Sequence, residues 1–324
     1  MVSETDLIRR YFTSAPRRAD VVLGVGDDGA VVRPPADAEV VVSVDTLIQD
    51  VHFPHETPAA AVGYKALAVN LSDLAAMGAE PAWATLALTL PEADESWLAD
   101  FSAGFFRLAN RHRLALIGGD LTRGPMSVTV QVMGLLPRGE ALRRDGARPG
   151  DLIFVTGSIG DAGLGLAAMR GTRTLDTISR DWCLQRLNEP SPRIGAGLGL
   201  RRIAHATIDV SDGLAIDLAR VLTASGVGAC ISLDAIPLSA AARAVYGDAV
   251  DWAAVLTAGD DYELLFTVSP ARAQDLARAF VGADCGITRI GQVERRAGLR
   301  YTLHGAAWTL DVRAGYDHFA GTPA

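Results

Sequence analysis

Aspartates that follow apolar runs are the residues of this sequence best suited to chemistry. Asp27 and Asp28 come directly after the β-branched run at 21–25, and Asp45 comes after the run at 40–44. Carboxylates crowded in this way repel one another unless a cation neutralises them. The grouping therefore indicates a bound metal ion. A solvated Asp-Gly turn is the alternative that the same residues leave open.

The glycines around these acids spell the pattern GxGxxG, at Gly24, Gly26 and Gly29. A dinucleotide-binding turn of this type needs a helix immediately after the glycines, whereas this chain continues into AVVRPP and another strand. Two aspartates in the loop would also repel phosphate groups unless divalent ions bridge the charges. The pattern therefore favours phosphate binding through metal ions over a dinucleotide site.

The order of apolar strand and aspartate recurs in both halves of the chain. It places acids at five predicted strand ends, at Asp28, Asp45, Asp120, Asp209 and Asp260, with Asp212 close to the fourth. One such junction is ordinary turn chemistry, but five of one kind predict a shared acidic centre.

Asp73 is a further acid, and it lies within the apolar helix that we expect after Pro58 and before Gly78. A carboxylate in so apolar a helix should face a cation or a hydrogen-bond donor, because burying it alone is costly. The alternative is a helix broken at residues 70–72, with Asp73 capping the turn that follows.

Three uses of clustered carboxylates compete. Glycoside hydrolysis needs only two acids and is usually accompanied by aromatic sugar platforms, whereas aromatic residues make up 6% of this chain. A calcium loop would show a compact DxDxDG pattern, which is absent from the sequence. Magnesium-assisted phosphoryl transfer requires several oxygen ligands, backbone donors for phosphate and an arginine, and the sequence offers all three.

The elements that must position these acids follow from hydrophobic periodicity. In the first half we expect helices at 3–13, 58–78 and 96–111, and strands at 21–25, 40–44, 83–90, 114–117 and 127–135. In the second half we expect strands at 152–156, 205–210, 252–257, 287–293 and 299–303, a tight acidic turn and a buried strand within 258–268, and helices after 157–160 and near 181–187, 194–202, 214–222 and 271–280. Ser211 or Asp212 is expected to cap the helix at 214–222.

A polar Gly/Pro connection, LRRDGARPGD, predicts a domain boundary near residue 150. The length of 324 residues and the hydrophobic fraction of 49% agree with two globular domains, at 1–150 and 151–324. Each is expected to be of the α/β type, with mixed helices and strands.

Composition excludes several classes of partner and site. The net charge of -8 and the pI near 5.3 give no basic footprint for nucleic acid. Lys65 is the only lysine, so a GxxxxGK[ST] phosphate loop is impossible. No basic N-terminal leader and no run of 18 apolar residues occurs, which predicts a cytoplasmic protein with no membrane partner. The three cysteines are widely separated and indicate neither a disulfide framework nor a thiolate zinc site.

Taken in order, the motifs resemble those of the thiamine-monophosphate kinase family. They include GVGDDGAVV, SVDTLIQDVHF, NLSDLAAMGA, LIGGDLTRGP, IDVSDGLAIDL, GDDYELLFTV and the C-terminal GYDHF, and they extend from about residue 3 to 320. Pieces such as DVSDG are shared with a wider ATP-binding superfamily that resembles aminoimidazole ribonucleotide synthetase. The resemblance implies a two-domain α/β fold, with an N-terminal mixed sheet that pairs with its twin in a homodimer and a C-terminal α/β domain that completes the site.

The resemblance also implies the reaction and the residues that serve it. ATP would convert thiamine monophosphate to thiamine diphosphate with several magnesium ions. The implied metal ligands are Asp28, Ser43, Asp45, Asp73, Asp120, Asp209 and Asp212. The implied contacts are Gly119, Asp120, Arg144 and Ser211 for ATP, and His52, Asp260 and Tyr316 for the substrate.

Two positions depart from the family pattern. Val44 stands where the family often has Thr, so only its main chain can serve a ligand there. Asp260 stands where the family commonly has Glu, which moves the charge by about one methylene.

Two alternatives to this kinase function remain. One is a sister synthetase of the superfamily, which usually needs a thiol or a lysine near its N-terminus, and neither occurs before residue 53. The other is a catalytically silent nucleotide-binding protein.

Overall fold

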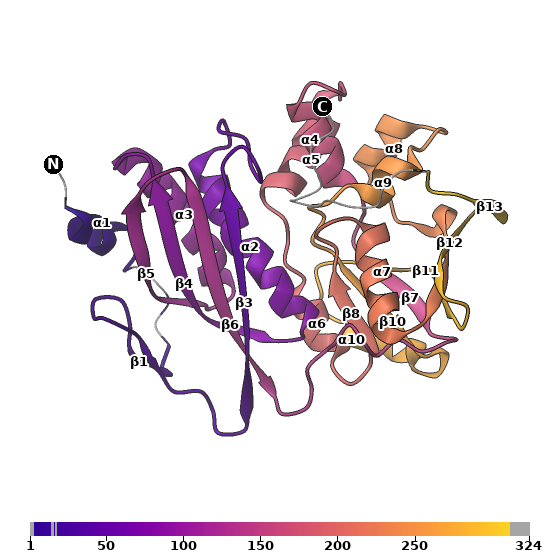
Figure 1. Cartoon of the computed structure of the whole chain (residues 1–324), viewed down its shortest axis with the longest axis horizontal. Helices are drawn as coiled ribbons and strands as arrows, with labels where there is room; N and C mark the ends of the chain where they lie inside the picture. The colour runs from indigo at the N-terminus through magenta and orange to yellow at the C-terminus, as the bar shows by residue number, and fades with distance from the viewer. Residues whose placement is uncertain (1–2, 14–15, 17, 312–324) are drawn as a thin grey trace. The chain divides into compact units, whose positions relative to one another are not determined.

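The computed structural model describes residues 3–13, 16 and 18–311, so the expected substrate contact Tyr316 lies outside the described residues. The chain divides into two compact units (Figure 1). The first comprises the chain up to Leu74 together with Ala79–Ala141, and the second comprises Ala75–Gly78 together with the chain from Leu142 onward. The division between Ala141 and Leu142 falls at the start of the connection LRRDGARPGD, which spans residues 142–151.

The first unit is built on a four-stranded mixed sheet. Its elements are α1 (Glu4–Tyr11), β1 (Val21–Leu23), β2 (Val31–Val32), β3 (Ala38–Ile48), α2 (Ala59–Ala76), β4 (Glu80–Leu90), α3 (Glu95–Arg111), β5 (Ala115–Arg123) and β6 (Ser127–Pro137). The strand order is β3-β6-β4-β5, in which β4 and β5 run parallel and the other pairs are antiparallel. The mixed sheet expected for the N-terminal half is therefore confirmed.

One face of this sheet is buried. Val128, Val130 and Val132 alternate along β6 and are fully buried, and the apolar helix α2 is buried along nearly its whole length. Helices α2 and α3 pack closely, because a Cβ on Gly63 or Gly104 would lie within 2.1 Å of a backbone oxygen of the other helix. Only glycine permits this approach. The core of the first unit thus lies between these helices and the sheet (Figure 1).

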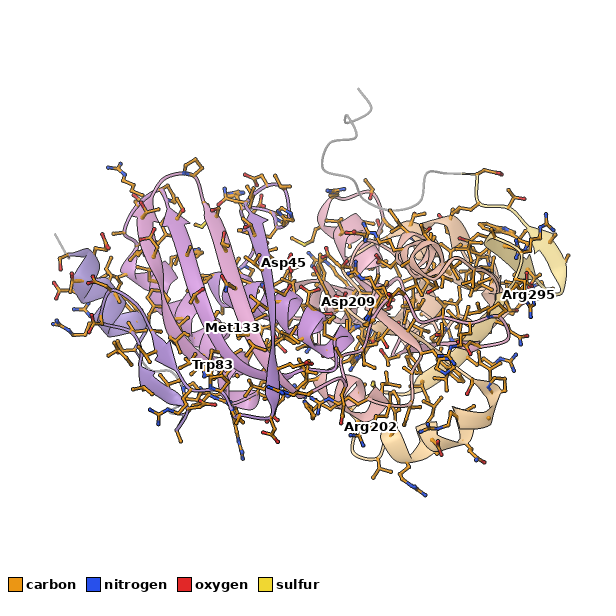
Figure 2. All side chains as sticks on the ribbon, turned by 60° about the horizontal axis from the view of Figure 1, so that its bottom comes forward. Asp45, Trp83, Met133, Arg202, Asp209 and Arg295 are labelled. Atoms are coloured by element: carbon orange, nitrogen blue, oxygen red, sulfur yellow. The ribbon has the colours of Figure 1, made fainter. Side chains whose placement is uncertain are left out.

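The opposite face of the sheet is covered at one end only. There the ribbon β1–β2 places Val21 and Val32 against a cluster that includes Trp83 and the neighbouring Met133 (Figure 2). On β3, Val42 pairs with Met133 and Val44 pairs with Gln131, and both valines are 56% exposed. In the described part of the first unit, these valines expose apolar surface next to the hydrogen-bonded pair Thr46 and Thr129.

The second unit contains a seven-stranded sheet and most of the remaining helices. Its elements are β7 (Leu152–Thr156), α4 (Asp161–Met169), α5 (Thr177–Asn188), α6 (Ile194–Leu200), β8 (Ala206–Asp209), α7 (Leu214–Ser225), β9 (Gly228–Ser232), η1 (Leu233–Ala235), α8 (Ala240–Tyr246), α9 (Trp252–Thr257), β10 (Leu264–Val268), η2 (Pro270–Asp275), α10 (Leu276–Ala279), β11 (Ile287–Glu294), β12 (Gly298–Leu303) and β13 (Ala306–Trp308). The strand order is β13-β12-β9-β11-β7-β10-β8, and among the described strands of this sheet only the pair β12–β9 is parallel.

Several expectations about these elements were wrong. Residues 252–257 form helix α9 and not a strand, because the Asp251 carboxylate accepts a hydrogen bond from the Ala254 N–H and caps a helical turn. The segment 271–280 is a 3₁₀ turn followed by the single turn α10. The strands β9 and β13 and the helix α8 were not predicted. Helix α2 continues through residues 70–73, so a break before Asp73 is excluded.

None of the helices in the described residues combines the length and the apolar character that a membrane crossing requires.

Candidate active site

Ser43 and Asp73 are the predicted site residues that the first unit brings into contact. The Ser43 hydroxyl on β3 donates a hydrogen bond of 2.5 Å to the Asp73 Oδ2 on α2. Asp73 therefore faces the sheet, as expected for a carboxylate in an apolar helix, and it is not a cap. Asp45 lies two residues after Ser43 on the same strand and so on the same sheet face.

Asp120 lies on the other face of that sheet. The strand register aligns Asp45 with Val130, Leu86 and Gly119, whereas Asp120 is aligned with the exposed Ala87. Paired residues of neighbouring strands point to the same face. The first unit by itself therefore does not gather Asp120 with Ser43, Asp45 and Asp73.

Asp45 and Asp120 also differ from the expectation in their place along the strands. Both were expected at strand ends, but β3 continues to Ile48 and β5 continues to Arg123. Gly119 has a φ of +154°, and a Cβ on it would lie 1.8 Å from the Leu86 carbonyl oxygen. Glycine is required at this position because the neighbouring strand approaches so closely.

Asp27 and Asp28 are exposed in the turn between β1 and β2. The Asp28 N–H donates a 2.9 Å hydrogen bond to Asp27 Oδ1, so the first carboxylate of the pair organises the turn. Strand β2 follows the glycines and no helix does, which confirms that the GxGxxG pattern is not a dinucleotide turn.

His52 is held in a tight turn after β3. Its Nδ1 accepts a 3.0 Å hydrogen bond from the Ile48 N–H, and its own backbone N–H donates to the Ile48 carbonyl. Because Nδ1 is an acceptor, the neutral ring carries its proton on Nε2. The histidine thus presents an N–H donor from a fixed ring.

In the second unit, Asp209 ends strand β8 and is 3% exposed (Figure 2). The two residues expected to cap α7 do not do so, since the N-cap is Gly213 and makes no side-chain hydrogen bond. Instead, the backbone N–H groups of Ser211 and Asp212 donate to Asp217 Oδ2 at 3.1 and 3.0 Å. Asp217 was missed by the sequence analysis.

Asp217 organises the loop after β8 from within the protein. It is fully buried, and burial raises the pKa of its carboxyl to about 6. The Arg220 guanidinium lies 2.6 Å from both Asp217 and Asp212. The signal that could have identified Asp217 is the one used for Asp73, a carboxylate on the inner face of an apolar helix.

Asp260 lies in a turn that packs on this loop. Its N–H donates to the Ser211 carbonyl at 2.8 Å, and its Oδ1 accepts a hydrogen bond from the Tyr262 hydroxyl at 3.1 Å. A Cβ on Gly259 would lie 2.4 Å from the Ser211 carbonyl oxygen. The second unit thus brings together Asp209, Ser211, Asp212 and Asp260 around the end of β8.

Arg144, the arginine predicted to contact ATP, has an exposed side chain. Its backbone carbonyl accepts a hydrogen bond from the Ser225 hydroxyl.

Next to the Asp260 turn, the second unit contains a cavity of about 370 Å³. Its walls include Gly160, Gly163, Thr257 and Ala258, and the last two directly precede Gly259 in the chain. This volume lies within the usual range for small-molecule pockets. Tyr246 also lines the cavity.

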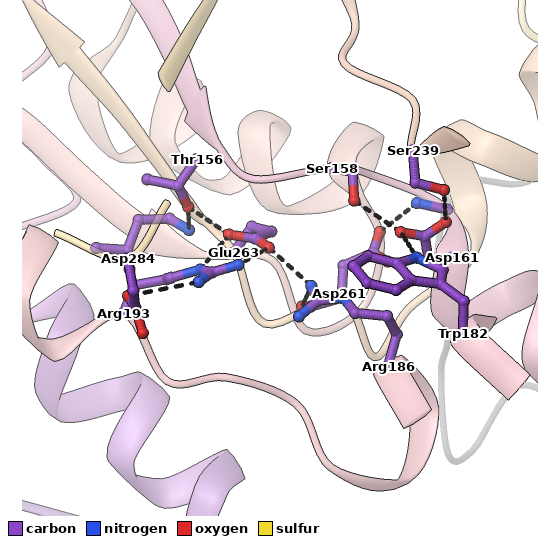
Figure 3. A network of polar contacts seen from close by, with 12 residues as sticks. Thr156, Ser158, Asp161, Trp182, Arg186, Arg193, Ser239, Asp261, Glu263 and Asp284 are labelled. Carbon is purple, nitrogen blue, oxygen red and sulfur yellow. Dashed lines mark hydrogen bonds and ion pairs between the residues drawn. The ribbon is translucent and has the colours of Figure 1, made fainter. Parts of the chain in front are cut away.

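A buried ionic network lies beneath the same turn (Figure 3). Glu263 has no exposed surface and contacts Arg186, Arg193 and Thr156. Neither Glu263 nor its two arginines was singled out by the sequence analysis. An acid inside the buried run YELLFTV was the available signal, since such a charge requires partners.

The donor set of the first unit fits a hard divalent cation. Carboxylate and hydroxyl oxygens are the ligands that magnesium prefers, and Ser43 and Asp73 are already in contact. Within the described residues of the chain, no three His, Cys, Asp or Glu side chains are gathered as a ready-made metal site.

Comparison with known proteins identifies the family. The chain matches the AIR synthase related protein N-terminal domain over residues 26–136 and the C-terminal domain over residues 148–304. The thiamine-monophosphate kinase of Salmonella typhimurium is 47% identical over 322 residues, covering 98% of both chains. This chain belongs to the thiamine-monophosphate kinases of the AIR synthase related family.

Solved structures of other thiamine-monophosphate kinases share the fold. The enzyme from Stenotrophomonas maltophilia K279a has a TM-score of 0.83 and 46% identity, covering 90% of this chain and 93% of that chain. The complex of AaThiL with AMPPCP and TMP has a TM-score of 0.77 and 31% identity, covering 91% and 92%. The two-domain fold expected from the resemblance is confirmed.

Proposed function

We propose that this protein transfers the γ-phosphoryl group of ATP directly to the phosphate of thiamine monophosphate, giving thiamine diphosphate and ADP. The observation that carries the proposal is the 47% identity to a thiamine-monophosphate kinase over 98% of both chains. The related structure that contains an ATP analogue and TMP supports the same pair of substrates. The protein is thus an ATP-dependent kinase whose acceptor is a phosphate group.

The acceptor phosphate needs no general base. A phosphate monoester has a second pKa of about 6 and is already an oxyanion nucleophile near neutral pH. Positioning and charge stabilisation therefore account for catalysis, and attack is in line with the leaving ADP. We expect neither a phosphoenzyme nor a proton-transferring histidine.

The proposed metal ligands are Asp28, Ser43, Asp45, Asp73, Asp120, Asp209 and Asp212. When bound, magnesium ions would supply charge screening between two polyanions that otherwise repel. Asp217 and Arg220 hold the Asp212 loop, and the backbone of Ser211 is fixed by the same carboxylate.

The nucleotide and acceptor contacts complete the proposal. Gly119, Asp120, Arg144 and Ser211 contact ATP, and Arg144 supplies positive charge to its phosphates. His52, Asp260 and Tyr316 contact thiamine monophosphate. A carboxylate at position 260 suits the cationic thiazolium ring of thiamine, and the adjoining cavity has a volume suited to a small heterocyclic ligand.

The active form is a homodimer in this proposal. The exposed Val42 and Val44 on the uncovered sheet face support it, because neighbouring apolar side chains exposed on one face are often covered by a partner. The three cysteines are free, which agrees with a reducing cytoplasmic location.

The testing experiment mixes purified protein with ATP and magnesium, with and without thiamine monophosphate. ADP is measured together with thiamine diphosphate, which is identified by mass spectrometry. One thiamine diphosphate per ADP supports the proposal, and Asp45→Asn and Asp120→Asn should then each lower kcat by about 100-fold or more. ADP release that requires a different phosphorylated or amide substrate would reassign the protein to a sister synthetase. Nucleotide binding without any turnover would favour the silent-binder alternative.

A further inference from the structure

The turn that carries Asp260 has an unusual backbone. Asp260 and Tyr262 both have positive φ, of 69° and 49°, although neither is glycine. Side chains with a Cβ rarely adopt this conformation, and it persists only where surrounding contacts impose it. Two such residues on either side of Asp261 indicate that the turn is held in place by its neighbours.

Part of this restraint comes from the loop after β8. The N–H of Asp260 donates to the Ser211 carbonyl, and the N–H of Tyr262 donates to the Val210 carbonyl, both at 2.8 Å. These two bonds fix one side of the turn. The carbonyl of Asp261 lies between them in the chain and needs a donor from elsewhere, since buried carbonyl groups are normally hydrogen-bonded.

Arg186 of helix α5 supplies that donor. Its Nη2 donates to the Asp261 carbonyl at 3.1 Å and also to Glu263 Oε1 at 2.7 Å (Figure 3). Arg186 is 8% exposed and Glu263 is fully buried. One guanidinium nitrogen thus links the centre of the turn to an acid at the start of β10.

Arg193 pairs with the same acid as Arg186 but does not bond to the turn. It donates from Nε and Nη2 to both oxygens of Glu263, at 2.6 and 2.5 Å, and so neutralises the same acid. Among the described residues, the hydrogen-bond and ion-pair partners of Arg193 are Glu263 and Asp284, and neither belongs to the turn at 260–262. The two arginines therefore share one buried partner, but only Arg186 also contacts the turn.

We propose that Arg186 is a positioning residue for the acceptor: through the Asp261 carbonyl and Glu263 it holds Asp260 in the left-handed turn from which its carboxylate meets thiamine monophosphate. This inference rests on the proposed function, in which Asp260 is a substrate contact. Arg186 itself does not touch the substrate in this account. A planar guanidinium suits the role, because the two N–H groups of Nη2 point in fixed directions and each serves one acceptor.

The test compares Arg186→Lys with Arg193→Lys. Each keeps a positive charge near Glu263, but a lysine side chain is one bond shorter, so its ammonium nitrogen at 186 does not reach the position from which Nη2 donates to both Glu263 and the Asp261 carbonyl. We expect Arg186→Lys to raise the KM for thiamine monophosphate by about tenfold while the KM for ATP stays within about twofold. Arg193→Lys should lower the melting temperature with little change in either KM.

A double-mutant cycle with Asp260→Asn separates positioning from general stability. If Arg186 acts through Asp260, Arg186→Lys should add less than about twofold to the acceptor KM once the Asp260 carboxylate is gone. A merely structural role predicts the same tenfold factor in both backgrounds. Additive effects, or equal changes in the KM values of ATP and acceptor, would overturn the proposal.

The remaining outcomes are also informative. Wild-type protein without thiamine-monophosphate kinase activity would refute the proposed function, whereas an active wild type with an additive cycle refutes only the role of Arg186. If Arg186→Lys does not fold, Arg186→Met replaces it in the cycle, because it removes the donor to the Asp261 carbonyl and leaves Glu263 paired with Arg193. Failure of both variants to fold would assign Arg186 to stability alone and overturn the proposal.

Discussion

Ser43 donates a hydrogen bond of 2.5 Å to Asp73, and this contact joins strand β3 to helix α2 beside Asp45. A hydroxyl donor on one carboxylate oxygen fixes the direction in which the other can accept a cation. The pair therefore provides an oriented oxygen ligand on the buried face of the first unit.

Asp73→Asn should lower kcat by about 100-fold or more and raise the magnesium concentration needed for half-maximal rate, because it removes a charged ligand. Ser43→Ala should have a smaller effect, about tenfold, since it removes the orienting hydroxyl and a weaker oxygen donor. The measurement is the initial rate against magnesium concentration. The matched control is Asp37→Asn, an exposed acid just before β3. Unchanged magnesium dependence in both site variants would contradict this role.

Asp260→Asn should raise the KM for thiamine monophosphate by about tenfold and leave the KM for ATP nearly unchanged. Asparagine tolerates the left-handed conformation and still offers an acceptor to the Tyr262 hydroxyl, so the change removes mainly the charge. Asp260→Glu keeps the charge but is less suited to positive φ. Its KM for thiamine monophosphate should therefore lie between those of the wild type and of Asp260→Asn. Steady-state kinetics with each substrate varied provide the check. A KM equal to wild type in the Asn variant would remove Asp260 from the acceptor site.

Val44→Glu should shift the protein from dimer to monomer, because it places a charge on the uncovered apolar face of the first sheet, where Val44 is 56% exposed. Val281→Glu is the control, since Val281 is 80% exposed and belongs to the second unit, not to the sheet that carries Val44. Light scattering after size-exclusion chromatography measures the mass of each. A wild-type protein that elutes as a monomer would refute dimer formation by this surface.

Gly157→Ala should destabilise the protein by about 2 kcal/mol or more relative to Gly171→Ala. Both glycines have positive φ, of 57° and 68°, so the conformational cost of alanine is shared. A Cβ at 157 would lie 2.1 Å from Glu263 Oε1, whereas nothing lies within 4 Å at 171. Denaturant unfolding of the two variants gives the difference. Equal free energies of unfolding would contradict the prediction, since Glu263 and its partners would then shift around the added methyl group without loss of stability.

The sequence by itself determined the order of most helices and strands and the chemical class of the site. Apolar periodicity located α2 and α3, because their patterns are long and their ends carry recognisable signals. It failed at residues 252–257, where six residues fit a strand or a helix and the cap at Asp251 decided for a helix. Aspartate and serine oxygens indicated a hard metal ion from residue type alone.

Only the tertiary structure decided how these residues are oriented. A bulge between β4 and β5 and the register of the sheet set Asp120 on the face opposite Asp45, because an extra residue reverses the side-chain alternation. Arg186 and Glu263 are 77 residues apart in the chain and meet only when α5 packs beside β10. Local patterns carry no information on such pairs, since a buried charge can be satisfied by any distant partner that the fold brings within reach.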